Sequence, residues 1–193
     1  MDYLIWKYRD TDGACSILEP TGLDSIVPLK EGTPLQAELS GKALSTAMNP
    51  ESPDDILLLD NVHNTDGILV VSGHLRAFLE ARSLRDVEYL QVSIVDHKGR
   101  VASDDYWVVH PLSPVDAIDL VASDCKMSRI KKTRIQSMTQ LVLRPEAVPA
   151  DRELFRLQGL WGVTLVSRTL ADAIAAAGFS GVEWQEVSAY PGA

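Results

Sequence analysis

The chain has 193 residues, of which 46% are hydrophobic and 23% charged, proportions that are typical of a globular protein and exclude a disordered one. No basic segment leads into an apolar run after Met1, and the longest apolar stretches, Ile56–Leu59 and Ile68–Val71, are much too short to span a bilayer. We therefore expect a single cytoplasmic domain over residues 1–193, with a loop-rich part at 1–54 and a core at 55–187.

The net charge of −9 is unevenly distributed. Residues 1–125 hold 9 Lys/Arg against 21 Asp/Glu, whereas residues 126–193 hold 9 against 6. An acidic excess disfavours binding to nucleic acid or to an anionic membrane. It suits a basic partner, or it serves solubility alone.

The predicted elements begin with a strand at Asp2–Tyr8, which alternates and carries aromatic residues. Gly, Pro, Asp and Ser then interrupt residues 10–55 too often for a long helix. Short strands are expected near Leu35–Leu39 and Ile56–Leu59. From residue 68 onward the pattern predicts strands at Ile68–Val71, Val87–Val95, Val101–Val109, within Ile130–Arg144, and at Leu154–Leu157, Gly162–Val166 and Val182–Val187. The segment Val115–Asp124 fits either a short strand or a helical turn.

Two helices are predicted, each preceded by a serine N-cap. Ser72 precedes a helix near His74–Arg82, and Ser167 precedes one over Arg168–Ala177, which ends at Gly178 as a left-handed cap. The expected fold class is α+β, with one mixed, mostly antiparallel sheet and these helices packed on it. The residues expected to face the core from the helices are Leu75, Leu79, Leu170 and Ile174.

An internal strand-helix-strand repeat is also indicated. The unit Val71-Ser72…Leu75…Leu79…Val87-Glu88-Tyr89…Val92 recurs 95 residues later as Val166-Ser167…Leu170…Ile174…Val182-Glu183-Trp184…Val187, without a gap. The alternative is that any capped strand-helix-strand unit shares these residue types, because caps and core faces demand them. If the repeat is real, the two units should share strand directions and be related by a rotation near a twofold.

No catalytic or cofactor motif is present: the sequence has no Gly-rich phosphate loop, no paired metal-ligand histidines and no nucleophile elbow. We expect no catalytic residue, no cofactor and no metal. The four histidines, His63, His74, His97 and His110, fit surface or strand-end positions. Asp54-Asp55 and Asp104-Asp105 fit turns better than a cation site, because adjacent carboxylates on a strand point apart.

The two cysteines, Cys15 and Cys125, fit reduced and inert thiols, since they form neither metal-ligand spacing nor a disulfide framework. A basic cluster follows Cys125. It lacks the interleaved aromatics of a nucleic-acid patch, so it is expected to protect a strand edge or to pair with the acidic half. The cluster consists of Lys126, Arg129, Lys131, Lys132 and Arg134.

The C-terminal half contains Leu154-Phe155-Arg156-Leu157, Val163–Ser167, and the closing motif Gly178-Phe179-Ser180-Gly181-Val182-Glu183-Trp184. With these motifs it resembles an immunity-protein family of bacterial polymorphic toxin systems (class eleven). Upstream, Val71-Ser72…Leu75…Leu79, Glu88-Tyr89-Leu90 and Val115–Asp119 resemble the central blocks of that family. The resemblance covers residues 55–187 and matches the first fifty residues weakly.

The resemblance implies a non-catalytic protein that binds and neutralises a cognate toxin domain, without nucleic acid or membrane as a partner. The acidic excess of residues 1–125 predicts that this part supplies the contact face, with Asp104, Asp105, Tyr106 and Trp107 as candidate partner-binding residues. In a strand, Asp105 and Trp107 share one face and Asp104 and Tyr106 the other, so one aromatic can be core and the other exposed. Two alternatives stay open: an enzyme that uses His63, His97 or His110 with a carboxylate, and a homo-oligomeric structural module.

Overall fold

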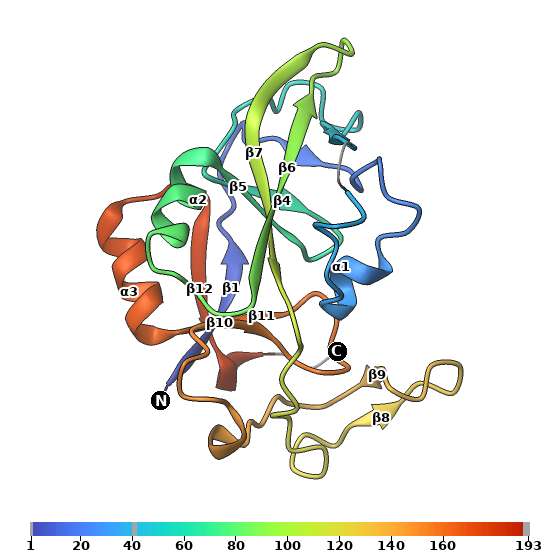
Figure 1. The fold of residues 1–193 in the computed structure, drawn as a ribbon, viewed down its shortest axis with the longest axis vertical. Coiled ribbons are helices and arrows are strands. Elements are labelled where there is room, and N and C mark those ends of the chain that lie inside the picture. Colours follow the sequence, from blue (N-terminus) through green and yellow to red (C-terminus); the bar gives the residue numbers. More distant parts are fainter. Residues whose placement is uncertain (1, 40–41, 191–193) are drawn as a thin grey trace.

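The computed structural model describes residues 2–39 and 42–190 and has an α+β fold, as the sequence predicts. Within these residues the strands form a six-stranded sheet of order β2-β4-β5-β7-β6-β3, a four-stranded sheet of order β10-β11-β1-β12, and a β8-β9 hairpin (Figure 1). The strands are β1 (Tyr3–Tyr8), β2 (Ser16–Ile17), β3 (Leu44–Ala47), β4 (Asn61–Asn64), β5 (Leu69–Ser72), β6 (Val87–Val95), β7 (Val101–Pro111), β8 (Lys126–Met127), β9 (Ile135–Ser137), β10 (Leu154–Arg156), β11 (Thr164–Ser167) and β12 (Val182–Glu186). The helices are α1 (Val27–Glu31), α2 (Gly73–Glu80) and α3 (Arg168–Ala177), with 3-10 turns η1 (Pro145–Ala147) and η2 (Val187–Ala189).

The prediction of one sheet was wrong, because the first strand joins the C-terminal half. β1 pairs antiparallel with β11 on one side and with β12 on the other. Its side chains alternate between two separate cores: Leu4 and Trp6 enter one cluster, and Tyr3 and Ile5 enter another. β1 is thereby buried on both faces, at the centre of a second sheet.

The two predicted repeat units have the same topology. In the first unit β5 and β6 run parallel, and β7 lies antiparallel between them, with α2 connecting β5 to β6. In the second unit β11 and β12 run parallel on either side of β1, with α3 connecting them. A further antiparallel strand, β4 or β10, borders each unit. The strand order β4-β5-β7-β6 therefore matches β10-β11-β1-β12.

The strand register is also the same in both units. The 95-residue offset that relates β5 to β11 and β6 to β12 carries most residue pairs of the first unit onto pairs of the second. The matching pairs are Asn61–Val71 with Leu154–Val166, Ser72–Tyr106 with Ser167–Tyr3, and Val87–Pro111 with Val182–Tyr8. Shared capping residues do not fix strand pairing, so the repeat extends beyond the capping pattern.

The helix ends follow the same repeat. The hydroxyl of Ser72 accepts a hydrogen bond from the backbone N–H of Leu75 at 3.2 Å, and the hydroxyl of Ser167 accepts one from Leu170 at 3.2 Å. The loops that follow the helices are left-handed at equivalent positions. These positions are Ser83 (φ 50°) and Asp86 (φ 54°) in the first unit, and Gly178 (φ 77°) and Gly181 (φ 74°) in the second. Only the second unit uses glycine there, which removes the steric cost of that conformation.

Contacts between the units are reciprocal. The loop after α3 meets the residue before β4, where the Ser180 hydroxyl donates to Asp60 at 2.8 Å. The loop after α2 meets the segment before β10, where Arg85 pairs with Asp151. Ser180 and Arg85 are themselves equivalent by the 95-residue offset. Each loop thus meets the segment that precedes the bordering strand of the other unit.

Three hydrophobic clusters alternate with the two large sheets. The middle cluster lies between the sheets and includes the core faces of both helices. The residues predicted to be buried, Leu75, Leu79, Leu170 and Ile174, all belong to it and are at most 1% exposed. In Figure 1, α2 and α3 lie next to each other at one side of the molecule. The ring of Phe179 meets the rings of His74 and Phe78 edge-to-face, with centroids 5.1 and 5.2 Å apart. The outer clusters cover the far face of each sheet.

Residues 10–59 differ from the prediction in detail. Leu35–Leu39 ends in a turn instead of a strand, and Ile56–Leu59 makes only an isolated bridge from Leu57 to Ala14. The prediction missed α1, which has Pro28 in its first turn and ends at the left-handed Gly32. Two strands of this segment, β2 and β3, join the six-stranded sheet, and the residues between them fold over its outer face, where Leu29 and Leu35 enter the core.

The long strand predicted within Ile130–Arg144 was also wrong. Only Ile135–Ser137 is a strand, although Met138 and Leu141 are buried with it in the outer cluster of the four-stranded sheet. Apolar residues there anchor a coil segment to a core and do not line one face of a sheet. The Val115–Asp124 segment likewise contains isolated bridges at Val115 and Ile118 followed by turns.

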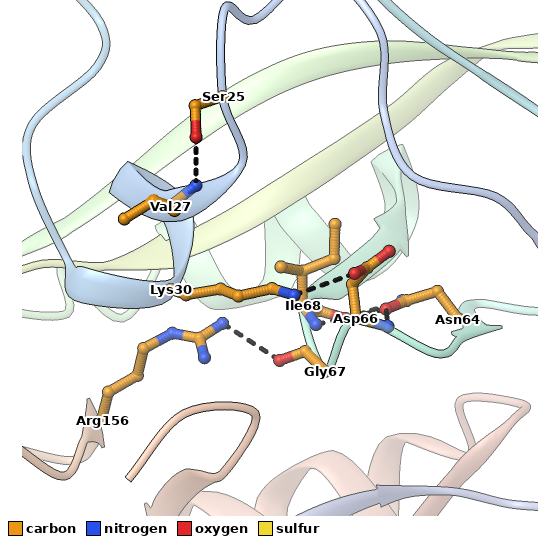
Figure 2. A network of polar contacts seen from close by, with 8 residues as sticks. All are labelled: Ser25, Val27, Lys30, Asn64, Asp66, Gly67, Ile68 and Arg156. Atoms are coloured by element: carbon orange, nitrogen blue, oxygen red, sulfur yellow. Dashed lines mark hydrogen bonds and ion pairs between the residues drawn. The ribbon is translucent and has the colours of Figure 1, made fainter. Parts of the chain in front are cut away.

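A polar bridge ties the N-terminal part to both sheets (Figure 2). Lys30 of α1 pairs with Asp66 in the β4–β5 turn at 2.9 Å. Next to it, the Arg156 guanidinium of β10 donates to the carbonyl oxygen of Gly67 at 3.2 Å. Arg156 is 1% exposed, and burial lowers its pKa to about 10. The bridge therefore holds the β4–β5 turn between the two sheets.

Candidate partner-binding surface

The four predicted contact residues lie on β7, and they divide between its two faces. Tyr106 is buried in the outer cluster of the six-stranded sheet, and its hydroxyl donates to the carbonyl oxygen of Leu59 at 2.9 Å. Burial raises the pKa of Tyr106. Asp104 and Asp105 are exposed, and Trp107 is half-buried. The strand thus presents one aromatic residue at the surface and uses the other as a core support.

Trp107 lies beneath a side chain of α2. The guanidinium carbon of Arg76 is 4.4 Å from the centre of the Trp107 ring and 5.7 Å from that of Tyr89. Arg76 also pairs with Glu80, one helical turn later, at 2.8 Å. A cation over an indole face is favourable when partly desolvated. Arg76 therefore holds one face of the ring in place.

Asp105 lies against the first residue of α2. Its Oδ1 accepts a hydrogen bond from the Trp107 indole N–H at 3.4 Å. A Cβ atom at Gly73 would lie 2.0 Å from that same oxygen, so the carboxylate occupies space that only glycine leaves open. Within the described part of the chain Asp105 forms no ion pair.

Gln91 completes the surface from the neighbouring strand. It pairs with Trp107 across β6 and β7 and is exposed. Its side-chain N–H donates to the carbonyl oxygen of Asp104 at 2.9 Å. We call the surface formed by Arg76, Gln91, Asp104, Asp105 and Trp107 the β7 patch. An aromatic residue flanked by carboxylates and fixed by packing has the composition of a protein-interface anchor.

The second unit shows what the same scaffold looks like without such a surface. By the shared register Leu4 occupies the position of Trp107, and Ala171 occupies that of Arg76. Leu4 and Ala171 are both buried in the middle cluster. The sequence alone did not reveal Arg76 and Gln91 as part of the patch. The signal was present in the repeat, where an arginine and a tryptophan replace a buried alanine and leucine, but it required the strand register.

The histidines of the alternative enzyme hypothesis lie in separate places. His110 is fully buried with its Nε2 2.8 Å from the carbonyl oxygen of Thr33, and burial lowers its pKa. His63 packs its ring 4.6 Å from that of Tyr8. His97 follows Asp96 in the β6–β7 turn, where that carboxylate bonds with Arg100 at 2.7 Å.

One hollow of about 230 Å³ lies where the two sheets meet. His63 lines it together with Tyr8, Asn61 and Thr164, and the described residues of the lining include no Asp or Glu. A histidine without a carboxylate or nucleophile beside it lacks the pairing that acid–base catalysis uses. The hollow therefore gives the enzyme hypothesis no support.

The cysteines, candidate metal ligands and helices of residues 2–39 and 42–190 bear on the remaining predictions. Burial raises the pKa of both thiols, to about 11 for Cys15. No group of three His, Cys, Asp or Glu side chains in these ranges is arranged to hold a metal ion. Nor does any helix there have the length and apolar character needed to cross a membrane.

The basic cluster lies on the β8–β9 hairpin, which stands apart from the two large sheets in Figure 1. Lys131 pairs with Glu31 of α1, and Lys131 and Arg134 lie over the Trp161 ring at 5.1 and 4.5 Å. Pairing with the acidic half is thus confirmed for Lys131. Ile130, at the tip, is 99% exposed.

Comparison with known protein families finds a match for this chain. The model of the immunity protein family Imm11 matches residues 32–189. The chain belongs to the Imm11 immunity protein family. The match begins at residue 32, earlier than the resemblance read from the sequence, which begins at residue 55. It contains both repeat units apart from β1. Of the segment that covers the six-stranded sheet, it contains the part that follows α1. A search of the curated proteins finds no match.

Membership of Imm11 associates the chain with the neutralisation of toxins. The matched residues include the whole β7 patch. They also include the core positions Leu75, Leu79, Leu170 and Ile174, so the match covers the fold as well as the candidate surface.

Proposed function

We propose that this protein is a non-catalytic immunity protein, a single domain over residues 1–193, that binds and neutralises a cognate bacterial toxin domain in the cytoplasm of the producing cell. It acts by occupying a surface of the toxin in a one-to-one complex and uses no cofactor. Neither nucleic acid nor a membrane is its partner. The observation that carries the proposal is membership of the immunity family.

The β7 patch is the contact surface within this proposal. Trp107 supplies a half-buried aromatic anchor, and Asp104 and Asp105 supply exposed negative charge next to it. Arg76 fixes the ring before any partner arrives, which lowers the entropy lost on binding. Tyr106 supports the patch from below through its hydrogen bond to Leu59.

Residues 1–125, which contain the patch, carry an excess of Asp and Glu, and this charge suits a basic toxin surface. Charges of opposite sign accelerate encounter, and salt screens that acceleration. Replacing Asp104 and Asp105 by asparagine should therefore slow association and weaken its dependence on salt.

The test is co-expression of the protein with the toxin domain encoded by the adjacent gene. The wild-type protein should restore growth and co-purify with that domain, whereas Trp107→Ala should lose both. Ile130→Ala on the β8–β9 hairpin is a matched control, since it removes an exposed apolar side chain elsewhere. Failure of the wild-type protein to rescue growth or to co-purify would contradict the proposal and favour the enzyme or homo-oligomer hypothesis.

A further inference from the structure

The two repeat units treat one carboxylate in opposite ways. Asp105 immediately precedes Tyr106, and Asp2 immediately precedes Tyr3, at equivalent positions of the shared register. Asp2 is bonded by Arg168, the first residue of α3, with 2.6 Å between Nε and Oδ2. The first residue of α2 is Gly73, which has no side chain to bond Asp105.

A second acceptor follows the same pattern. The Arg168 guanidinium also contacts both oxygens of Glu186 on β12, at 2.8 and 2.9 Å. Glu186 is equivalent to Gln91, which pairs with Trp107 as Glu186 pairs with Leu4. These two carboxylates raise the pKa of Arg168. In the second unit, one guanidinium thus joins the central strand, the outer strand and the helix.

The first unit retains acceptors at both places but has no guanidinium at the first residue of its helix, and Arg76, three residues later, lies over Trp107 instead. Asp105 and Gln91 are exposed. The amide N–H of Gln91 donates to Asp104, which leaves its amide oxygen to accept. A guanidinium between a carboxylate and an amide oxygen forms charge-assisted hydrogen bonds in a fixed geometry. Trp107 adds an aromatic surface beside this position.

We infer that an arginine side chain of the toxin domain enters the β7 patch between Asp105 and Gln91, an inference that rests on the proposed function. This arginine would take the position that Arg168 holds in the second unit. Gly73 keeps that position open at the start of α2. The partner is therefore recognised by a guanidinium next to an apolar group that packs on Trp107. The acidic balance of residues 1–125 assists its approach.

The inference can be tested by filling the position from within. Gly73 does not have a positive φ, so an arginine is compatible with its backbone once the flexible Asp105 carboxylate shifts. The pair Gly73→Arg with Gln91→Glu reproduces the residue types of the second unit. It should melt at or above the wild-type temperature, while affinity for the toxin domain encoded by the adjacent gene should fall at least about 10-fold.

Asp105→Asn provides an independent variant that keeps shape and should weaken binding about 10- to 100-fold. Asp2→Asn is its matched control in the second unit and should change affinity less than about 2-fold. The affinities are measured by isothermal titration, with circular dichroism melts to verify folding.

The outcomes separate the inference from the proposed function. If the wild-type protein binds and both Asp105→Asn and the double variant bind equally well, the arginine contact is contradicted and the proposed function stands. Loss of binding in Trp107→Ala alone has the same meaning, since it would indicate an apolar contact without a guanidinium. If the wild-type protein does not bind the toxin domain, both are contradicted.

Discussion

The two halves of this fold share strand order, register and helix caps, but they end in different chemistry. In the second unit Ala171 and Leu4 are buried, and the guanidinium of Arg168 pairs with Asp2 and Glu186. In the first unit the equivalent positions belong to the β7 patch, with Arg76, Trp107 and an Asp105 carboxylate that forms no ion pair among the described residues. The same scaffold therefore carries paired charges in the second unit and an exposed carboxylate without an ion pair in the first.

Residues that both units share serve the fold, whereas residues found in only one unit are not explained by the fold. Both units need a serine cap, two apolar helix positions and a tyrosine beside the cap, so these residues serve folding. Only the first unit has a half-buried tryptophan at the position that Leu4 holds in the second, and only there does the carboxylate before the tyrosine form no ion pair among the described residues. The β7 patch is therefore the surface at which a functional contact is expected.

The largest expected effect is the same in both units. Leu75→Ala and Leu170→Ala each remove a fully buried side chain from the middle cluster and should each lower the free energy of unfolding by about 2–5 kcal/mol. Chemical denaturation measures both. A loss in only one variant would show that the two helices are not equivalent in the core.

A smaller effect is expected where the units meet. Burial raises the pKa of Asp60, but hydrogen bonds from Ser180 and Ser72 outweigh it and lower the pKa below its ordinary value. A lowered pKa in the folded state contributes stability above the unfolded-state pKa, which is lost as pH falls through the folded value. Asp60→Asn should cost about 2 kcal/mol at neutral pH.

The pH dependence identifies the source of that effect. The difference in unfolding free energy between wild type and Asp60→Asn should begin to shrink as pH falls below about 4, the pKa of an unfolded aspartate, and should shrink further as pH falls through the lower pKa of Asp60 in the folded protein. Glu153→Gln, at the corresponding contact with Ser167, is the control. A difference that stays constant down to acidic pH would exclude the charge of Asp60 as its cause.

Removing either helix cap should have a moderate and matched effect. Ser72→Ala and Ser167→Ala should each cost about 1 kcal/mol, because each leaves the N–H of a leucine three residues later without its acceptor. Thermal melts measure both variants. A change in only one variant would contradict the equivalence of the two helix starts, and no change in either would show that the serine hydroxyls do not stabilise the helices.

The smallest effect on stability is expected in the β7 patch. Asp105→Asn should change stability by no more than about 0.5 kcal/mol, since the side chain is exposed. Asp2→Asn should be the more destabilising of the two, because it breaks a contact with Arg168. The reverse order in denaturation experiments would mean that Asp105 serves the fold.

Local patterns predicted the parts of the fold that local chemistry determines. Val87–Val95 and Arg168–Ala177 were predicted with the observed bounds, because strand alternation and a serine cap with a left-handed glycine mark them. β4 was missed, since the polar run Asn61–Asn64 has no strand signature. The second sheet was missed because β1 finds its partners more than 150 residues away.

The candidate surface was predictable only in part. Alternation along β7 correctly separated Tyr106 from Trp107, but it did not indicate which one faces the core. That choice depends on the segments that cover each face of the sheet, including Leu29 and Leu35 on one side. Arg76 reaches Trp107 from a helix that precedes it by about thirty residues, a contact that spacing does not reveal.

Neutralisation by occupation of a surface on the toxin is tested most directly by its stoichiometry. The activity of the toxin domain encoded by the adjacent gene should be followed while the protein is added at concentrations well above their dissociation constant. We expect the activity to fall linearly and to reach its minimum at one equivalent. Loss of activity at a small fraction of an equivalent, or no loss at all, would contradict the account.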